Sequence, residues 1–414
     1  MTTPIDALVL NARLRQSLVT VRSLGRRGLA VAAVDTEADV PAFRSRWCRS
    51  HAAFPPGFSV ASLEQLVDRL GARVLIPCHD GTVALLRTHR ARLEQRTRIA
   101  LASEPAIGVA VNKARTLALA QRLGVRVPRS LSLTRVSEVP SALAEIGLPA
   151  VVKPTESWLP GGQKDGPKGT WVGPRLVTTP DEARRAVADL ERLAGVALFQ
   201  TLLSGRREAV SLLYANGEIH ARFAQWAKRM NPPLGGESVL RQSISVPPDI
   251  GMHAERLVRE IGLEGYSEVE FRRDAAGVPY LMEINPRLSA SVEIAVRSGV
   301  DFPHLLYQWA SGGRVDHVGS YRVGGWMRYL QGDLMTTIAA IEQRGRPGVP
   351  SPWEAALGFG ASFLKPMHYD YFDWRDPRPA VKAMTDFTRE LTRSSVRVVQ
   401  RTVGGLRRGC AWSS

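Results

Sequence analysis

The first hundred residues alternate short apolar runs with stretches of helical periodicity. The apolar runs predict strands at Asp6–Leu10, Ala30–Val34 and Val74–Pro77. The periodic stretches predict helices at Ser17–Arg27, Ser62–Leu70 and Gly81–Arg96. This alternation predicts a parallel sheet covered on both faces, so we expect a Rossmann-like domain over residues 1–105. The first turn, Asn11–Ser17, lacks the GxGxxG pattern, which disfavours an NAD-type enzyme.

From about residue 105 the pattern changes to paired strands with helices between them. Asn216-Gly217 joins two predicted strands and is the strongest short signal for a hairpin. A second hairpin is predicted to pair Glu268–Arg272 with Pro279–Ile284. Such hairpins predict α+β structure, so we expect a second domain of different architecture over residues 106–315.

The last part of the chain, residues 316–414, is predicted to be a C-terminal extension. It is rich in Pro, Gly and Trp up to about residue 378. A helix is then predicted at Pro379–Val403. Its arginines recur every four residues and form a basic stripe: Arg389, Arg393, Arg397 and Arg401. Two interpretations are open: a solvated helix face, which we favour, or a module that docks on an anionic surface.

The charge balance is strongly basic, with a formal net charge of +16. Only seven of the 55 basic residues are lysine, and the basic residues are spread along the whole chain. This distribution is typical of a GC-rich genome and does not favour nucleic acid as the main partner. Five of the seven lysines fall between residues 113 and 228, where chemistry would require an ammonium group: Lys113, Lys153, Lys164, Lys168 and Lys228.

Composition also bounds the class of protein. With 44% hydrophobic and 23% charged residues, the chain is expected to be globular. No apolar run reaches the roughly 18–20 residues that a membrane span needs, and no cleavable signal pattern is found. The three cysteines, Cys48, Cys78 and Cys410, form no CxxC pair. We therefore expect a cytoplasmic protein without a disulfide scaffold or zinc ribbon.

The strongest chemical pattern is the second hairpin, with Glu270 on one strand and Glu283 and Asn285 on the other. Alternate residues of a strand share a face, so these three side chains are predicted to point the same way. Val269, Phe271, Met282 and Ile284 are expected on the opposite face. Two glutamates and an asparagine suit Mg²⁺, whose remaining ligands are typically phosphate oxygens and water. The alternative is a structural network in which Arg272, Arg273 and Arg287 pair with the acids.

Weaker signals precede and follow this hairpin. The segment Pro160–Thr170 holds four glycines and two lysines, as expected of a phosphate lid or of an ordinary surface loop. Lys153 ends a buried strand. Gln200–Glu208 places a carboxylate three residues beyond a strand-ending glycine. Lys228–Arg241 combines glycines, a serine and cations, as expected near phosphate or carboxylate, although it is also a plausible loop between strands.

Together and in this order, these motifs resemble the ATP-grasp superfamily, in the branch of carbamoyl phosphate synthetase and biotin carboxylase. Within that branch the chain is similar to carboxylate–amine ligases. The resemblance covers about residues 1–310. It is carried by Asn112-Lys113 with Gly124–Pro128, by Val152–Pro154, and above all by Glu268–Phe271 with Glu283–Arg287. It implies a Rossmann-like domain followed by an ATP-grasp fold that clamps ATP, with a lid subdomain at about 125–205.

The resemblance also implies a role for each matching position. Lys113 and Lys153 would contact the ATP phosphates under a lid that includes Gly162, Lys168 and Gly169. Glu208 would bind the ribose hydroxyls, and the backbone groups of Gln200, Thr201, Leu202 and Leu203 would contact adenine. Glu270, Glu283 and Asn285 would hold one or two Mg²⁺ ions, or Mn²⁺ in their place. Arg287 would stabilise the transferring phosphoryl group. Three positions depart from the family pattern: a longer lid with Trp158, Thr201 in place of an acid, and Glu268 in place of Asn.

The implied function is ATP-driven coupling of a carboxylate to an amine through an acyl phosphate, with release of ADP and phosphate. Three alternatives remain: a carboxylase-type enzyme that forms carboxyphosphate, a non-catalytic ATP-binding protein, and docking through the arginine stripe. The expected partners are a small-molecule carboxylate and amine, and a homodimer is the default assembly. The sequence does not identify the substrates or the role of residues 316–414.

Overall fold

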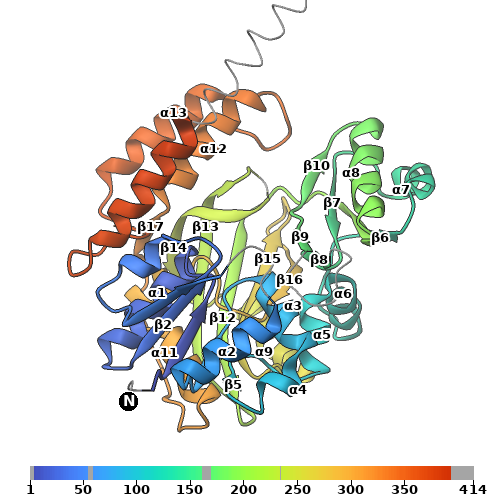
Figure 1. Ribbon diagram of the computed structural model, residues 1–414. Helices are drawn as coiled ribbons and strands as arrows, with labels where there is room; N and C mark the ends of the chain where they lie inside the picture. Colours follow the sequence, from blue (N-terminus) through green and yellow to red (C-terminus); the bar gives the residue numbers. More distant parts are fainter. Residues whose placement is uncertain (1–3, 55–58, 161–168, 234, 393–414) are drawn as a thin grey trace, which may run out of the picture.

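The N-terminal sheet is a doubly wound parallel sheet (Figure 1). The computed structural model describes residues 4–54, 59–160, 169–233 and 235–392. The strand order is β3-β2-β1-β4-β5, with all pairs parallel. The strands are β1 (Ala7–Leu10), β2 (Val31–Asp35), β3 (Ser50–Ala53), β4 (Val74–Ile76) and β5 (Arg98–Ile99). The sequence analysis predicted the three central strands but not the short edge strands, which carry weak hydrophobic patterns.

Four helices accompany this sheet: α1 (Arg15–Arg26), α2 (Val60–Leu70), α3 (Asp80–Thr88) and α4 (Arg90–Leu93). The single helix predicted at 81–96 is thus two helices, because the backbone leaves helical geometry at His89 (φ −113°, ψ 19°). Strand β1 lies between β2 and β4. The chain therefore adds strands on one side of β1 first and on its other side afterwards. Such a reversal of strand order opens a crevice at the carboxyl ends of the two strands.

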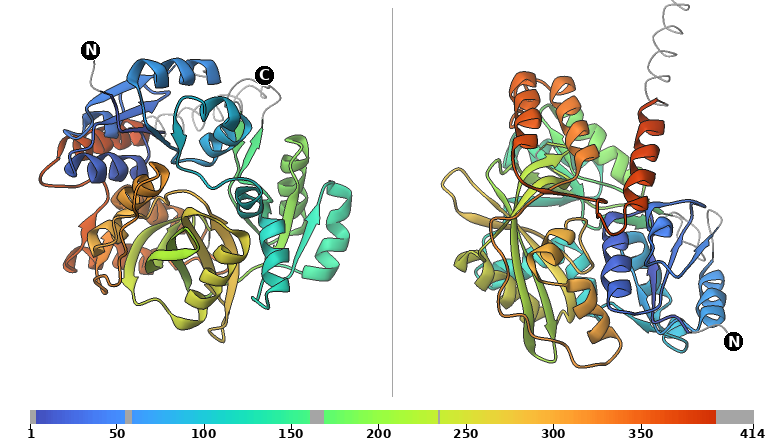
Figure 2. Two further views of the ribbon diagram at one scale, coloured as in Figure 1. Left: turned by 90° about the horizontal axis from the view of Figure 1, so that it is seen from below. Right: turned by 90° about the vertical axis from the view of Figure 1, so that its left-hand side faces the viewer.

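The central sheet has seven strands in the order β16-β15-β12-β13-β14-β17-β18 (Figures 1 and 2). Its main strands are β12 (Arg207–Ala215), β13 (Glu218–Asn231), β14 (Glu237–Ile244), β15 (Gly265–Arg273) and β16 (Pro279–Asn285). All their neighbouring pairs are antiparallel, as the two predicted hairpins require. The short edge strands β17 (Trp326–Arg328) and β18 (His368–Tyr369) come from the C-terminal extension. This extension therefore continues the central sheet.

Helices bury both faces of the central sheet. On one side lie α5 (Ala106–Val111), α6 (Lys113–Arg122) and α9 (Pro248–Ile261), whose apolar residues share one core with β12, β15 and β16. On the other side lie α10 (Glu293–Ser298) and α11 (Phe302–Ala310), which pack together with α1. The N-terminal and central sheets are thus joined through continuous hydrophobic cores.

A third, antiparallel sheet stands apart from this body (Figure 1). Its strand order is β10-β7-β11-β6, and it has its own small core with α7 (Val139–Ile146) and α8 (Pro180–Arg192). The strands are β6 (Ser130–Leu133), β7 (Ala150–Pro154), β10 (Arg175–Val177) and β11 (Ala197–Thr201). A two-stranded ribbon of β8 (Trp158–Pro160) and β9 (Gly169–Trp171) adjoins it. These elements confirm the predicted combination of a parallel α/β sheet with α+β structure.

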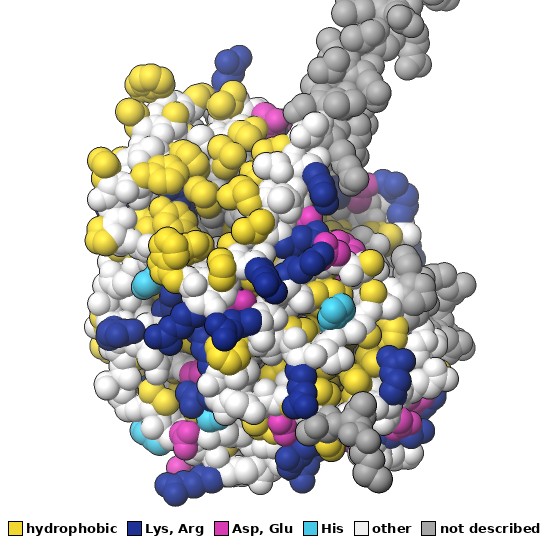
Figure 3. Space-filling model, turned by 60° about the vertical axis from the view of Figure 1, so that its left-hand side comes forward, with side chains coloured by type: hydrophobic (Ala, Val, Ile, Leu, Met, Phe, Trp, Pro, Cys, Tyr) yellow, Lys and Arg dark blue, Asp and Glu magenta, His cyan; other side chains and the backbone are white. Residues whose placement is uncertain are grey.

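Up to about residue 378 of the C-terminal extension, the sequence analysis predicted only a composition, whereas the structure contains helices there. Helices α12 (Leu330–Glu342) and α13 (Pro352–Ala361) form a hairpin on β13. Residues 378–392 form a further helix, which confirms the described part of the helix predicted from Pro379 onward. Figure 3 shows hydrophobic side chains gathered on the α12–α13 hairpin, where Trp353 is 72% exposed. Of the predicted basic stripe, Arg389 lies on the helix, whereas Arg393, Arg397 and Arg401 lie outside the described residues. No helix in the described part of the chain is long and apolar enough to span a membrane.

A buried ion cluster joins three distant parts of the chain. The Asp370 carboxylate, which follows β18, accepts a hydrogen bond from Arg15 Nη1 at 2.5 Å. It also accepts one from Arg241 Nη2, on β14, at 2.5 Å. Arg241 is completely buried. Burial alone would raise the pKa of Asp370, but Arg241 and Arg15 outweigh this effect and lower it.

We expect Asp370→Ala to lower the free energy of unfolding by about 3–5 kcal/mol, because it leaves the buried Arg241 guanidinium without its carboxylate. Urea unfolding followed by circular dichroism measures the change. The control is Glu94→Ala, which removes a surface carboxylate paired with Arg90 and should cost less than about 1 kcal/mol. Equal losses in the two variants would contradict the structural role of Asp370.

Candidate functional site

One large cavity lies where the three sheets meet. Its volume is about 780 Å³. The N-terminal sheet contributes the turns after β1 and β4, which form the crevice at the reversal of strand order. The third sheet contributes β7 and the segment after β11, and the central sheet contributes β12, β15 and β16. The cavity therefore combines a sheet-end crevice with a cleft between two α+β bodies, both of which are common ligand sites.

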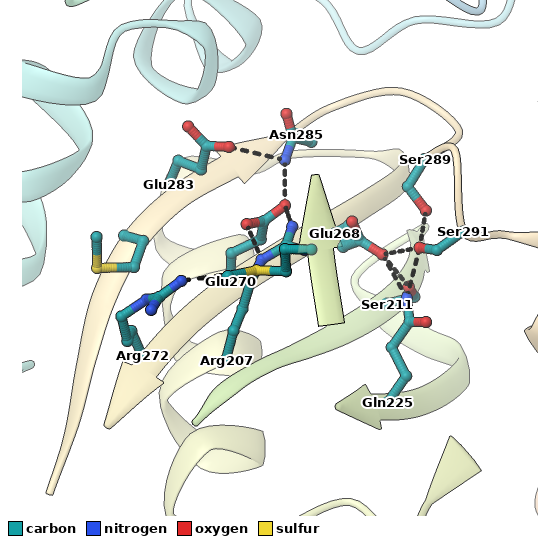
Figure 4. Close-up of polar contacts among 12 residues, drawn as sticks. Arg207, Ser211, Gln225, Glu268, Glu270, Arg272, Glu283, Asn285, Ser289 and Ser291 are labelled. Atoms are coloured by element: carbon teal, nitrogen blue, oxygen red, sulfur yellow. Dashed lines mark hydrogen bonds and ion pairs between the residues drawn. The ribbon is translucent and has the colours of Figure 1, made fainter. Parts of the chain in front are cut away.

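The β15–β16 hairpin places the predicted carboxylates opposite each other (Figure 4). Glu270 pairs in register with Glu283, and Glu268 with Asn285. The Asn285 side-chain amide donates to Glu270 Oε1 at 3.1 Å and to Glu283 Oε1 at 3.5 Å. All four side chains line the cavity. The structure thus brings together the three residues that were predicted to hold a metal.

One residue of this hairpin lies on the unexpected face. Val269, Phe271 and Ile284 are buried in the core, as predicted. Met282 lines the cavity instead, which corrects the prediction. The register shifts between Glu270 and Phe271, and this irregularity interrupts the alternation of faces along β16.

Cations from three elements surround the carboxylates. Arg207, at the start of β12, forms an ion pair with Glu270 at 2.5 Å. Lys113, at the start of α6, lies 3.4 Å from Glu283 Oε2 and donates to Ser157 Oγ at 2.8 Å. Lys153 on β7 donates to the Met282 carbonyl at 3.4 Å. The sequence analysis gave no role to Arg207, although the strand period around Glu208 would have placed it on the opposite face from that glutamate.

Burial and neighbouring charge shift the pKa values of these groups in different directions. Burial, aided by Glu283, raises the pKa of Glu270 despite the adjacent Arg207. Burial would also raise the pKa of Glu283, but Lys113 and Lys153 outweigh it and hold that pKa below its usual value. Burial lowers the pKa of Lys153 to about 8. The cluster therefore holds charges close together at a partly buried site.

Arg287 is tied to the N-terminal sheet. Its guanidinium donates to Asp80 Oδ1 at 2.5 Å and to Oδ2 at 3.0 Å. Burial would raise the pKa of Asp80, but Arg287 lowers it to about 2. The sequence analysis missed Asp80. Its position at the first residue of α3, beyond the carboxyl end of β4, was the available signal.

Only some of the residues predicted to bind adenine and ribose line the cavity. Thr201, Leu202 and Leu203 line the cavity. Gln200 does not: its side chain is buried in the third sheet, and its amide has no hydrogen-bond partner among the described residues. Glu208 lies on the opposite face of β12 from Arg207, where Arg273 donates to it at 2.7 Å. Neither the Gln200 nor the Glu208 side chain therefore lines the large cavity, and the adenine and ribose contacts of these two residues stay predictions.

Only part of the predicted lid lies within the described residues. Gly169 begins β9, and Trp171 and Val172 line the cavity. Gly162 and Lys168 lie outside the described residues. The ring of Trp158 packs against Gly81 and Gly169, where an added Cβ would lie within 2.9 Å and 2.5 Å of the indole. The β8–β9 ribbon therefore packs directly on the start of α3.

The end of the cavity opposite the third sheet is built partly by the C-terminal extension. Tyr329 and Tyr371 line it, together with Arg15 and Glu237. The Arg15 guanidinium lies 4.0 Å from the centre of the Tyr329 ring and pairs with both Glu237 and Asp370. Arg241, considered from the sequence as a cation for a carboxylate substrate, does not line the cavity because Asp370 holds it in the core.

The donor set is suited to a hard divalent cation. Among the described residues, no group of three or more His, Cys, Asp or Glu side chains is placed to hold a metal. Glu270, Glu283 and Asn285 supply two carboxylates and one amide at one wall of the cavity. An incomplete set of oxygen ligands matches Mg²⁺, which usually completes its shell with phosphate oxygens and water. The residues present therefore fit a metal that arrives with a phosphorylated ligand.

Comparisons with known proteins agree with this architecture. The family described as "ATP-grasp in the biosynthetic pathway with Ter operon" matches residues 199–331. A D-alanine–D-alanine ligase of Pseudomonas entomophila is 26% identical over 219 residues, which is 49% of this chain and 64% of the ligase. The chain thus spans slightly less than two thirds of that relative.

Two solved structures show the same fold. The biotin carboxylase domain of 2-oxoglutarate carboxylase from Hydrogenobacter thermophilus, in complex with MgADP, ADP and bicarbonate, superposes with a TM-score of 0.60 at 17% identity, covering 78% of this chain and 74% of that one. N5-carboxyaminoimidazole synthetase from Staphylococcus aureus gives a TM-score of 0.60 at 14% identity, covering 83% and 88%. The chain thus has the fold of these two enzymes, its residues 199–331 match an ATP-grasp family, and about half of it is similar to a D-alanine–D-alanine ligase.

Proposed function

We propose that the protein is an ATP-dependent ligase that activates a carboxylate as an acyl phosphate and couples it to an amine, with release of ADP and phosphate. The observation that carries this proposal is the facing pair Glu270 and Glu283, with Asn285 beside them and Lys113 and Lys153 around them, at the wall of one cavity. The similarity to a D-alanine–D-alanine ligase supports it. The proposed partners are therefore a small-molecule carboxylate and amine.

In this mechanism the chain positions charge and excludes water. Lys113 and Lys153 would hold the phosphates of ATP, whose adenine would lie against Thr201–Leu203. Glu270, Glu283 and Asn285 would hold Mg²⁺, which neutralises phosphate charge when bound. The substrate carboxylate oxygen would then attack the γ-phosphorus, and ADP would leave. Because phosphoryl transfer depends mainly on positioning and charge neutralisation, the site needs no serine or cysteine nucleophile.

The acyl phosphate would form between the hairpin carboxylates and Arg287. That guanidinium is fixed by Asp80, so it would be oriented before the phosphoryl group arrives. The acceptor, as the neutral amine, would then attack the acyl carbon and displace phosphate, and the amide forms as the nitrogen gives a proton to the departing phosphate. The free thiols of Cys48 and Cys78 support a reducing compartment such as the cytoplasm.

The direct test is ADP release with Mg²⁺-ATP, hydroxylamine and a panel of carboxylic acids that includes bicarbonate. Hydroxylamine traps an acyl phosphate as a hydroxamate. We expect one acid to give ADP and hydroxamate together. ADP with bicarbonate alone and no hydroxamate would favour the carboxyphosphate alternative. ATP binding without ADP release for any acid would favour a non-catalytic protein.

We expect Glu283→Gln and Lys153→Ala each to lower turnover by about 10²-fold or more, because each removes a charge that acts on the transferring phosphoryl group. Steady-state ADP release measures the loss, and thermal unfolding checks that both variants are folded. The matched control Glu94→Gln removes a carboxylate outside the cavity and should leave turnover unchanged. Near-normal turnover in both site variants would contradict the assignment of the site.

ATP affinity should depend on pH through Lys153. Because its pKa in the folded protein is about 8, the side chain carries its charge below pH 8 and loses it above. We therefore expect ATP to bind more weakly as the pH rises from 7 to 9. Calorimetric titration at several pH values measures this dependence, which should flatten in Lys153→Arg because guanidinium stays protonated. An equal pH dependence in the variant would show that another group is responsible.

The same pKa difference affects stability. The pKa of Lys153 is lower in the folded protein than its ordinary value of 10.5, so the folded state disfavours the charged form. The Lys153 ammonium therefore lowers the free energy of unfolding. This loss is complete below pH 8 and is relieved as the pH rises from about 8 to about 10.5. We expect Lys153→Met to stabilise the ligand-free protein more at pH 7 than at pH 10, as measured by urea unfolding.

A further inference from the structure

The acidic side chains of the cavity differ in how their charge is balanced. Five acidic residues line it: Asp80, Glu237, Glu268, Glu270 and Glu283. Four of them form ion pairs. Arg287 pairs with Asp80, Arg15 with Glu237, Arg207 with Glu270 and Lys113 with Glu283. Within the described part of the chain, Glu268 alone among the five forms no ion pair.

Glu268 is held instead by uncharged donors (Figure 4). Its Oε2 accepts hydrogen bonds from Gln225 Nε2 at 3.0 Å, Ser291 Oγ at 3.3 Å and Ser211 Oγ at 3.5 Å. All three donors converge on the same oxygen, so the carboxylate is fixed in orientation while Oε1 makes no hydrogen bond to a described residue. The side chain is only 3% exposed. A carboxylate this deeply buried is costly when no cation pairs with it directly, and a cationic ligand would relieve that cost.

The position of Glu268 relates it to the proposed reaction. It lies two residues before Glu270 on the same strand, so both side chains share a face and their Cα atoms lie about 7 Å apart. It pairs in register with Asn285, the last residue of β16, and the loop that follows this strand holds both Arg287 and Ser291, which donates to Glu268. A ligand held by Glu268 would therefore lie beside the place proposed for the acyl phosphate.

We propose that Glu268 binds the ammonium group of the acceptor substrate. This inference rests on the proposed function, because it identifies the acceptor as a primary amine that enters the cavity as a cation. An ammonium group has three donors and no acceptor, so it complements a carboxylate oxygen flanked by serine hydroxyls. Mg²⁺ is disfavoured at this position because one available carboxylate oxygen is a poor substitute for its octahedral shell.

The test is a binding experiment that does not depend on turnover. The full-length chain is titrated with primary ammonium compounds, each compared with the analogue in which hydroxyl replaces the ammonium group: 2-aminoethanol with ethylene glycol, alanine with lactate, and 1,4-diaminobutane with 1,4-butanediol. Thermal shift and calorimetry give the affinities. We expect one or more ammonium compounds to bind the wild type, and Glu268→Gln to weaken that binding about ten- to hundredfold, as expected for a lost charge-assisted hydrogen bond. Glu94→Gln is the matched control and should leave the affinity unchanged.

The outcomes are separable from those of the proposed function. No binding of any ammonium compound, equal binding of the hydroxyl analogues, or equal affinity in Glu268→Gln would each overturn the inference. Ammonium binding without hydroxamate formation would contradict the proposed function while leaving the cation site in place. If Glu268→Gln does not fold, Ser291→Ala replaces it: the loss of one orienting donor should weaken ammonium binding several-fold, and unchanged affinity would overturn the inference. Titration with MgCl₂ and KCl separates an ammonium site from a metal site.

Discussion

The pairing of buried charges between distant segments is the constraint on which this structure depends. Asp370 joins α1, β14 and the C-terminal extension, because Arg15 and Arg241 both donate to it in the core. The ion pair of Arg287 with Asp80 joins the central sheet to the N-terminal sheet in the same way. A buried charge without its partner costs several kcal/mol, so these pairs fix how the sheets meet. The cavity lies where these sheets and the third sheet meet, and polar side chains from all three line it.

The same constraint separates structural charges from candidate functional ones. A carboxylate that already has an arginine, such as Asp80, is satisfied before any ligand binds. Lys153 and Glu268 are different, because the first is buried with a lowered pKa and the second has only uncharged donors. Ligands of opposite charge would compensate both, a phosphate at one and an ammonium at the other. The two positions flank the facing pair of Glu270 and Glu283.

Sequence reasoning succeeded where the pattern was local. The two-residue period of β15 and β16 placed Glu270 opposite Glu283, because hairpin strands are paired by their own turn. It was wrong at Met282, where a register shift interrupts the period. Short edge strands and the helices α12 and α13 of the extension carried too little periodicity to be predicted.

By itself, the sequence determined the fold class and the residues of the facing carboxylate pair, since periodicity and hairpin turns act over a few residues. Only the tertiary structure decided which cation accompanies each acid. Asp80 and Arg287 are 207 positions apart in the chain, and Arg15 and Asp370 are 355 apart. No local pattern encodes such pairs, because they form only when hydrophobic burial has packed the sheets together. For that reason it became visible only in three dimensions that, among the described residues, Glu268 forms no ion pair.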